Sequence, residues 1–287
     1  MAHHPMTVPQ PVPCDTGPHP AESHQPDIHF VLPTLRPGLG EMSRSARYQT
    51  HAQIGIFTYP EIGGTMADRI LVFDFDGVIV DTESAVVAGW RAECADLDIH
   101  FDEKAFLATL GQQSLRPERV AQILGEAAGD PPAAVLRIRS RVRALALELP
   151  ALPGVRELLA EARDAGVRTA VASGAAREWV TGHLERLGLR PAFAGVFCRD
   201  DVAAAKPAPD VYLAALAGLG ATAEAAVAIE DTATGVTAAK AAGLRCVAVP
   251  GPLTAGHDLA AADLVLPSLT GIGLDDLFSL QARAGTV

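Results

Sequence analysis

The sequence predicts an α/β protein with a doubly wound, Rossmann-like parallel sheet and an inserted helical cap domain. Short apolar runs such as residues 70–75 are typical of strands buried on both faces of a sheet, and amphipathic helical segments separate them. Alternation of this kind with short connections indicates right-handed crossovers between parallel strands. The one long interval without a strand pattern, residues 83–150, is the predicted cap.

The core domain is predicted from residues 66–82 and 151–287. A helix over 154–166 shows the pattern most clearly, because Val155, Leu158 and Leu159 recur at helical spacing and Gly166 provides a C-terminal stop. The remaining core elements follow in regular order. They are strands at 167–172, 193–198, 227–229, 245–249 and 264–266, and helices at 177–187, 209–219 and 234–242.

The cap is predicted as four helices, at residues 85–97, 103–110, 117–124 and 133–149. Two linkers bound it, Asp81-Thr82 at the start and residues 149–153 at the end. Because both linkers lie at one edge of the predicted sheet, a hinge between cap and core is expected.

The first 65 residues differ from the rest in composition. They hold 10 of the 21 prolines and 6 of the 9 histidines, and little in them is periodic. We therefore expect residues 1–65 to be a mostly disordered leader. Met66 directly precedes the first strand, and Gly63-Gly64 could be encoded by a ribosome-binding purine run. We hypothesise that translation starts at Met66, which an intact mass including residues 1–65 would contradict.

Charge and cysteine usage exclude several classes of protein. The net charge is −11, whereas non-specific nucleic-acid binding and docking on an anionic membrane both favour a basic face. The 4 cysteines lie far apart and form no C-x-x-C pair, so neither structural zinc nor a disulfide framework is expected. No apolar run approaches the roughly 18 residues of a membrane span, and no secretory signal is evident. A cytoplasmic protein is expected.

Polar residues follow several of the predicted strands. Asp74 and Asp76 follow the first, Ser173-Gly174 the second, and Glu230-Asp231 the strand at 227–229, while Lys206 precedes a helix. In open α/β sheets ligands bind beyond the carboxyl ends of the strands, so these residues should converge on one crevice. Four carboxylates there would repel one another unless a cation lay among them, and an all-oxygen set suits Mg²⁺.

These residues form a recognisable set of motifs. Asp-Phe-Asp-Gly-Val-Ile-Val-Asp-Thr-Glu from Asp74, then Ser173, then Lys-Pro-Ala-Pro-Asp from Lys206, then Ile-Glu-Asp-Thr ending at Thr232, stand in order along the chain. Over residues 69 to about 280 the sequence resembles the haloacid dehalogenase superfamily, in the branch of beta-phosphoglucomutase and small sugar-phosphate phosphatases. The resemblance implies a cap inserted after the first strand and a small phosphorylated metabolite as the substrate.

The resemblance also implies a role for each motif residue. Asp74 would be the nucleophile that forms an aspartyl phosphate, and Asp76 would protonate the leaving oxygen and later deprotonate the water. Lys206 would offset the charge of the nucleophile and the phosphoryl group. Ser173 and Gly174 would bind the phosphoryl oxygens. Mg²⁺ would be held by Asp74, the backbone carbonyl of Asp76, and Asp231, with Glu230 as a direct or second-shell ligand.

Several residues keep two interpretations. Asp81 and Thr82 form a helix-capping sequence, and Thr82 is equally a candidate substrate contact. Arg116 lies where related caps carry a specificity loop and is a candidate contact to the non-reacting end of the substrate. The scarce Lys240 is expected to be solvated, and His183 is expected to be structural.

Several enzymatic activities and one non-catalytic function are weighed against the motifs. A Mg²⁺-dependent phosphatase acting on a sugar or polyol phosphate is favoured. Mutases of the branch carry a histidine near the position of Val86, but no histidine occurs between Phe57 and Ile99. A dehalogenase or a phosphonatase would not keep both carboxylates of the first motif. A phosphonatase would also need a Schiff-base lysine in the cap, where Lys104 is the only lysine. A non-catalytic phosphate sensor would not need the acid/base Asp76.

Overall fold

The computed structural model describes residues 56–57, 65–107, 115–279 and 282–283. Most of the predicted leader lies outside these residues, as does the end of the helix predicted at 103–110. Two short strands, β1 (Ile56–Phe57) and β8 (Ala282–Arg283), pair antiparallel. Within the described residues no helix is both long and apolar enough to cross a bilayer.

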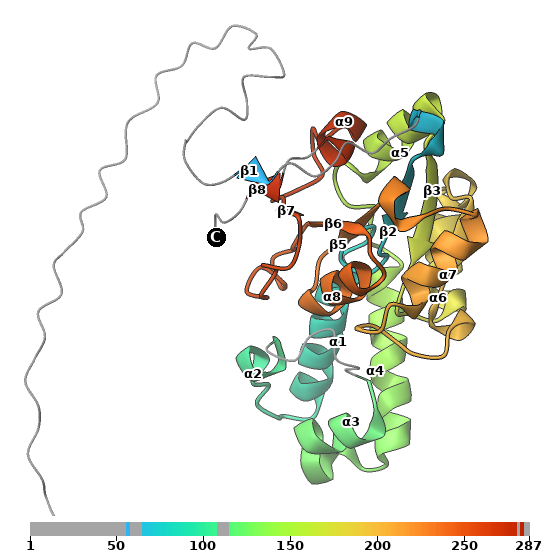
Figure 1. Ribbon diagram of the computed structural model, residues 1–287. Coiled ribbons are helices and arrows are strands. Elements are labelled where there is room, and N and C mark those ends of the chain that lie inside the picture. Colours follow the sequence, from blue (N-terminus) through green and yellow to red (C-terminus); the bar gives the residue numbers. More distant parts are fainter. Residues whose placement is uncertain (1–55, 58–64, 108–114, 280–281, 284–287) are drawn as a thin grey trace, which may run out of the picture. The chain divides into compact units, whose positions relative to one another are not determined.

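A six-stranded, fully parallel sheet forms the centre of the core domain (Figure 1), which confirms the predicted fold class. The first strand of the sheet, β2, is paired on one side with β3 and on the other with β5. Strands are therefore added first on one side of β2 and then on the other side. Ligands of such folds bind at this switch point in the strand order. In spatial order the strands are β4 (Gly195–Phe197), β3 (Arg168–Ala172), β2 (Ile70–Phe73), β5 (Ala226–Glu230), β6 (Arg245–Ala248) and β7 (Leu264–Val265).

Helices cover both faces of this sheet. Side chains alternate between the faces along a strand, so Leu71 and Phe73 enter one apolar cluster while Ile70 and Val72 enter the other. The first cluster includes residues of α5 (Val155–Ala165), α6 (Arg177–Arg186) and α9 (Leu274–Phe278), and the second includes residues of α7 (Asp210–Leu219) and α8 (Ala233–Ala241). Each fully buried large side chain contributes about 1.5–3 kcal/mol to folding.

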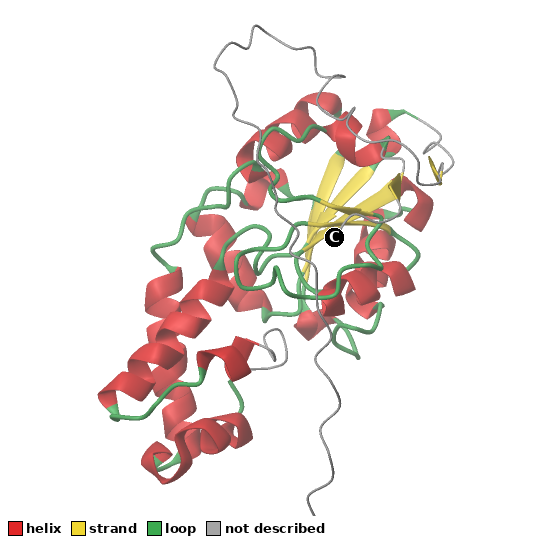
Figure 2. Cartoon of the chain, turned by 90° about the vertical axis from the view of Figure 1, so that its left-hand side faces the viewer, coloured by secondary structure: helices red, strands yellow, loops and turns green. Residues whose placement is uncertain are grey.

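In its described residues, 83–107 and 115–150, the cap is helical and has no strand (Figure 2), and it has an apolar core of its own. Trp90, Val120 and Ile138, from three of its helices, are buried there. The helices are α1 (Thr82–Asp96), α2 (Glu103–Leu107), α3 (Pro117–Leu124) and α4 (Pro131–Ala146). Short 3-10 helices complete the described chain, at Met66–Asp68, Gly125–Ala128, Arg190–Ala192, Arg199–Asp201 and Ala223–Ala225.

Capping side chains account for two helix starts that the sequence prediction placed two or three residues too late. Asp81 Oδ1 accepts a hydrogen bond from Ser84 N at 3.1 Å, so α1 begins at Thr82. Asp130 Oδ2 accepts one from Ala133 N at 3.1 Å, and Pro131 occupies the first turn of α4.

The chain enters and leaves the cap at one place. Leu152 N, just after the cap, donates a hydrogen bond of 2.8 Å to Ile79 O, just before it. Within the cap, Glu93 of α1 is only 2% exposed and forms ion pairs with Arg137 (2.9 Å) and Arg141 (3.2 Å) of α4. The two longest cap helices are therefore joined by charge as well as by apolar packing.

Candidate active site

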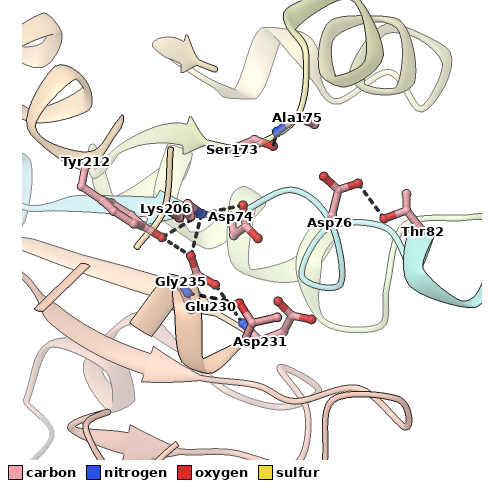
Figure 3. Close-up of polar contacts among 11 residues, drawn as sticks. Asp74, Asp76, Thr82, Ser173, Ala175, Lys206, Tyr212, Glu230, Asp231 and Gly235 are labelled. Atoms are coloured by element: carbon pink, nitrogen blue, oxygen red, sulfur yellow. Dashed lines mark hydrogen bonds and ion pairs between the residues drawn. The ribbon is translucent and has the colours of Figure 1, made fainter. Parts of the chain in front are cut away.

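The residues predicted at the strand ends converge beyond the carboxyl edge of the sheet (Figure 3). Asp74 directly follows β2, Ser173 directly follows β3, and Glu230 is the last residue of β5. Lys206, in the connection before α7, reaches the same place. Parallel strands end at one edge, so residues as far apart in sequence as Asp74 and Glu230 become neighbours.

A tight turn after β2 presents the first motif. Asp74 N donates to Ile229 O at 2.9 Å, which fixes the start of the turn on the neighbouring strand. Gly77 N then donates to Val80 O at 2.8 Å, and Gly77 has φ +78°. A β-carbon at this position would lie 2.1 Å from Asp231 Oδ2. Glycine is therefore required here both by the backbone conformation and by the closeness of Asp231.

Lys206 lies between two carboxylates. Its Nζ donates to Asp74 Oδ1 at 2.9 Å and to Glu230 Oε1 at 2.6 Å, and its side chain is 10% exposed. Burial lowers the pKa of Lys206, but the two carboxylates outweigh that effect and raise it above its ordinary value. Burial raises the pKa of Asp74 to about 7 against the opposing effect of Lys206, and the charges of Glu230 and Asp76 add to the rise.

Tyr212 is a site residue that the sequence analysis missed. Its hydroxyl donates to Glu230 Oε1 at 2.6 Å, and burial followed by the Glu230 charge raises the pKa of the phenol. The only signal in the sequence was a tyrosine on the apolar face of a helix, which needs a polar partner when buried. The identity of that partner depends on how α7 packs against β5.

Three carboxylates meet in the site with incomplete hydrogen bonding. Asp74, Glu230 and Asp231 each offer an oxygen, and these atoms lie within 4.8 Å of one another. Asp231 is 1% exposed, and its Oδ1 has no hydrogen-bond partner within the described structure. Burial, followed by the charges of Asp74 and Glu230, raises the pKa of Asp231 well above its ordinary value. A buried carboxylate oxygen without a partner fits a bound cation, which would supply the missing interaction.

Glu230 is already occupied by protein groups. Its Oε1 accepts hydrogen bonds from Lys206 and Tyr212, and its Oε2 accepts one from Asp231 N at 3.2 Å. Asp74 and Asp231 therefore have more oxygen capacity available for a cation than Glu230 has. This arrangement favours the alternative in which Glu230 supports Lys206 and Asp231 and does not bind the cation itself.

Asp76, two residues after Asp74, has its own set of donors. Thr82 Oγ1 donates to Asp76 Oδ1 at 2.6 Å, and Trp179 Nε1 donates to the same oxygen at 3.1 Å. Burial raises the pKa of Asp76, while hydrogen bonds from Thr82, Trp179 and Ser173 oppose the rise. A raised pKa is what a carboxyl group needs to act as a general acid.

Ser173 is fully buried beside Asp76. Its backbone N donates to Phe197 O at 2.9 Å, and its Oγ accepts a hydrogen bond from Ala175 N at 3.0 Å. These two bonds fix the position of the Ser173 hydroxyl oxygen and leave its proton available for donation to a neighbouring oxygen. Gly174, the next residue, is exposed.

A small cavity of about 30 Å³ lies beside the carboxylates, large enough for a water molecule or an ion. Asp231, Gly77 and Glu83 line it, together with the loop over residues 251–254. Glu83 is a second residue for which the sequence analysis assigned no role. Burial raises the pKa of Glu83 to about 8, and the charges of Asp76 and Asp74 add to the rise.

The two residues predicted as possible substrate contacts, Thr82 and Arg116, occupy different surroundings. Thr82 is 2% exposed and its hydroxyl donates a hydrogen bond to Asp76, so Thr82 orients that carboxylate. Arg116 is exposed and stands at the N-cap position of α3, next to residues outside the described structure. The substrate roles of both residues stay predictions.

The residues interpreted as structural occupy other positions. Lys240 is not simply solvated, because it forms an ion pair with Asp263 at 2.7 Å. His183 is 2% exposed and packs against the Trp179 ring, with centroids 4.4 Å apart. Burial lowers the pKa of His183 to about 4, with smaller contributions from nearby arginines. Lys104, the candidate Schiff-base lysine, is exposed on α2.

Replacing Gly235 with alanine is expected to disturb the site by displacing the Glu230 carboxylate. A β-carbon at Gly235 would lie 1.9 Å from Glu230 Oε2, whose carboxylate cannot move freely because Lys206 and Tyr212 hold it. We expect stability to fall by about 1–3 kcal/mol and turnover by about 10²-fold. Urea unfolding and steady-state kinetics measure the two effects.

The matched control is Gly182→Ala. Gly182 lies within α6, and a β-carbon there would meet nothing within 4 Å. Alanine should stabilise this helix by up to about 1 kcal/mol and leave turnover unchanged. Equal behaviour of the two variants would contradict the packing role of Gly235.

Comparison with known proteins gives consistent results. A family model for haloacid dehalogenase-like hydrolases matches residues 69–243. Protein CbbY of Rhodobacter capsulatus is 35% identical over 214 residues, covering 70% of this chain and 94% of the relative. Hexitol phosphatase B of Escherichia coli strain K12 is 31% identical over 224 residues, covering 72% of this chain and 95% of the relative.

A solved structure also superposes on this chain. The crystal structure of CbbY from Rhodobacter sphaeroides in complex with phosphate has a TM-score of 0.61 and 34% sequence identity. It covers 73% of this chain and 98% of the solved chain. The similarity thus extends over nearly the whole length of that protein.

Proposed function

Because this chain belongs to the haloacid dehalogenase-like hydrolase family, we propose that it is a Mg²⁺-dependent phosphatase that hydrolyses a small sugar or polyol phosphate through an aspartyl phosphate. The observation that carries the proposal is the convergence of Asp74, Asp76, Lys206 and Asp231 at one sheet edge, with a buried Asp231 oxygen that lacks a partner. Such a constellation combines a nucleophile, an acid/base and a site for a cation.

In the first step Asp74 attacks phosphorus. Lys206 binds Oδ1 of Asp74, which leaves Oδ2 to form the new O–P bond while the bond from phosphorus to the ester oxygen breaks. Asp76 gives its proton to the leaving oxygen. The products are the aspartyl phosphate and the free alcohol.

In the second step a water molecule displaces the Asp74 carboxylate from phosphorus. Asp76, now ionised, accepts a proton from the water, whose oxygen bonds to phosphorus as the bond to Asp74 breaks. Inorganic phosphate leaves, Asp74 is again a free carboxylate, and Asp76 again carries a proton. Ser173, Gly174 and Lys206 would hold the phosphoryl oxygens in both steps, supplying donors to the negative charge.

The residues present fit a magnesium ion. Asp74 and Asp231 would hold it together with the backbone carbonyl of Asp76, and Glu230 would support Lys206 and Asp231 through hydrogen bonds. When bound, Mg²⁺ neutralises charge on the phosphoryl oxygens and lets two carboxylates approach a phosphate.

Phosphatase activity is favoured over mutase activity by the cap. At the position where related mutases carry a histidine, this chain has Val86, which packs against the apolar core of the cap. Valine cannot exchange protons with a sugar hydroxyl. The hexitol phosphatase relative supports a sugar or polyol phosphate as the substrate class.

Phosphate release from a panel of sugar and polyol phosphates, and from p-nitrophenyl phosphate, tests the proposal. We expect turnover with Mg²⁺, loss of turnover in EDTA, and recovery when Mg²⁺ is restored, since the carboxylates repel the substrate without a cation. Metal-independent turnover would contradict the cation site. Conversion of glucose 1-phosphate to glucose 6-phosphate with little phosphate released would show a mutase instead.

A further inference from the structure

Trp179 is a residue of the site to which neither the sequence motifs nor the proposed reaction gives a role. It lies in the first turn of α6, just after the connection that carries Ser173. Its indole Nε1 donates a hydrogen bond of 3.1 Å to Asp76 Oδ1. The acid/base carboxylate is therefore held by a side chain of a different element from its own.

Two side-chain donors bind the same oxygen of Asp76, one from the first motif and one from α6. Thr82 Oγ1, at the start of the cap, and Trp179 Nε1, from a core helix, each donate to Oδ1. Oδ2 takes neither bond, and Figure 3 shows it turned away from Thr82. The Asp76 carboxylate also has a hydrogen bond from Ser173. Two donors on Oδ1 restrict the rotation of the carboxylate and leave Oδ2 as the oxygen that can carry the proton of the reaction.

Packing fixes the direction of the indole. Trp179 is half-buried and contacts both the apolar cluster of the core and that of the cap. The ring of His183 meets it edge-on, with an interplanar angle of 68°. Because these contacts restrict the ring, the N–H bond points at Asp76 without the ordering cost that a flexible donor would carry.

The other tryptophan of the chain gives a contrast. Trp90 is fully buried in the cap, and its Nε1 has no hydrogen-bond partner among the described residues. Trp90 therefore acts through its apolar surface, whereas Trp179 combines apolar contact with a directed donor. The chain thus supplies its own comparison between a packing role and a positioning role.

We infer that Trp179 is a positioning residue for the proton-transfer steps, acting through Asp76, and this inference rests on the proposed phosphatase function. Without the indole donor, Asp76 keeps only the Thr82 bond of this pair and rotates more freely. The transfer of its proton to a leaving alkoxide should then slow. Phosphoryl transfer from an ester whose leaving group needs no proton should be affected far less.

The test compares Trp179→Phe with Trp90→Phe. For the alkyl phosphate hydrolysed best in the substrate panel, Trp179→Phe should lower kcat by about 10- to 30-fold, with KM within about twofold of the wild type. With p-nitrophenyl phosphate, whose leaving group departs unprotonated, the first-turnover burst of p-nitrophenol should slow by less than about threefold. Trp90→Phe should show no difference between the two leaving groups.

A second variant separates the hydrogen bond from the ring. Incorporating 3-benzothienylalanine at position 179, in the Trp90→Phe background, keeps the shape of the indole but replaces N–H with sulfur. The inference expects this variant to reproduce the loss seen with Trp179→Phe, and it decides the matter if Trp179→Phe does not fold.

Three outcomes overturn the inference: equal losses for both leaving groups, an effect on KM alone, or full activity of the benzothienyl variant. The proposed function fails in a different way, when the wild-type protein releases no phosphate from any ester of the panel. The two failures are therefore distinguishable.

Discussion

Replacing Asp74 with asparagine is expected to lower turnover of p-nitrophenyl phosphate on the order of 10⁴-fold or more. The amide retains the size of the carboxylate but has no oxygen nucleophilic enough to attack phosphorus. The bond from Lys206 to Oδ1 shows that the Asp74 side chain is held in place, so loss of chemistry is expected without loss of the fold. Initial rates with saturating Mg²⁺ measure the effect.

A matched control for this change is Asp210→Asn. Asp210 Oδ1 accepts a hydrogen bond from Ala204 N at 3.2 Å, a bond that an amide oxygen can also accept. This variant should keep wild-type turnover. In addition, acid quenching of the wild-type protein during turnover should trap one phosphoryl group in the peptide that contains Asp74. A phosphoryl group on another residue, or turnover retained in Asp74→Asn, would end the nucleophile assignment.

Replacing Lys206 with methionine should damage stability and activity together. The change leaves Asp74 and Glu230 as neighbouring buried carboxylates without their shared cation. Removing one partner of a buried ion pair costs about 3–5 kcal/mol, and loss of one donor to the transferring group costs about 10²–10³-fold in turnover. The urea midpoint and kcat measure the two losses.

The double variant Lys206→Met/Glu230→Gln distinguishes the cause. If unpaired charge destabilises the single variant, neutralising Glu230 should restore part of the stability but not the turnover, giving a non-additive cycle. Lys240→Met is the control, because its ion pair with Asp263 lies in a more exposed position, where the lysine side chain is 31% exposed. A smaller loss of stability and unchanged turnover are expected there. Additive losses at Lys206 and Glu230 would contradict the coupling.

The elements predicted best from sequence are those whose signal is local. Strands such as 70–73 are apolar without interruption because the sheet is covered on both faces, and α5 ends at Ala165, just before Gly166, which has φ +72°. Helix starts were predicted too late at Asp81 and Asp130: the capping sequence at Asp81 was recognised but kept a second interpretation, and the cap at Asp130 was identified only by its hydrogen bond. The helix α9, Leu274–Phe278, is too short to show a period and was not predicted.

The candidate site divides in the same way. Asp74, Asp76, Lys206 and Asp231 stand in motifs and could be named from the sequence. Tyr212 and Trp179 could not, because each is identified by the carboxylate it reaches, across α7 and β5 in one case and across α6 and the turn after β2 in the other. Likewise, the missing partner of Asp231 Oδ1 follows from burial, which only the packed structure defines.

The hydrogen bond between Leu152 N and Ile79 O makes the inserted segment a closed loop with a clamped base. This bond holds the two ends of the segment together whatever the length of the chain between them. Lengthening such a closed loop costs little additional conformational entropy. The cap can thus be lengthened, shortened or replaced while the strands of the sheet stay unchanged. A chimera with the hexitol phosphatase segment spliced in between Ile79 and Leu152 should therefore fold and take over the donor's substrate preference. Retention of the parent's preference would show that the sheet edge selects the substrate.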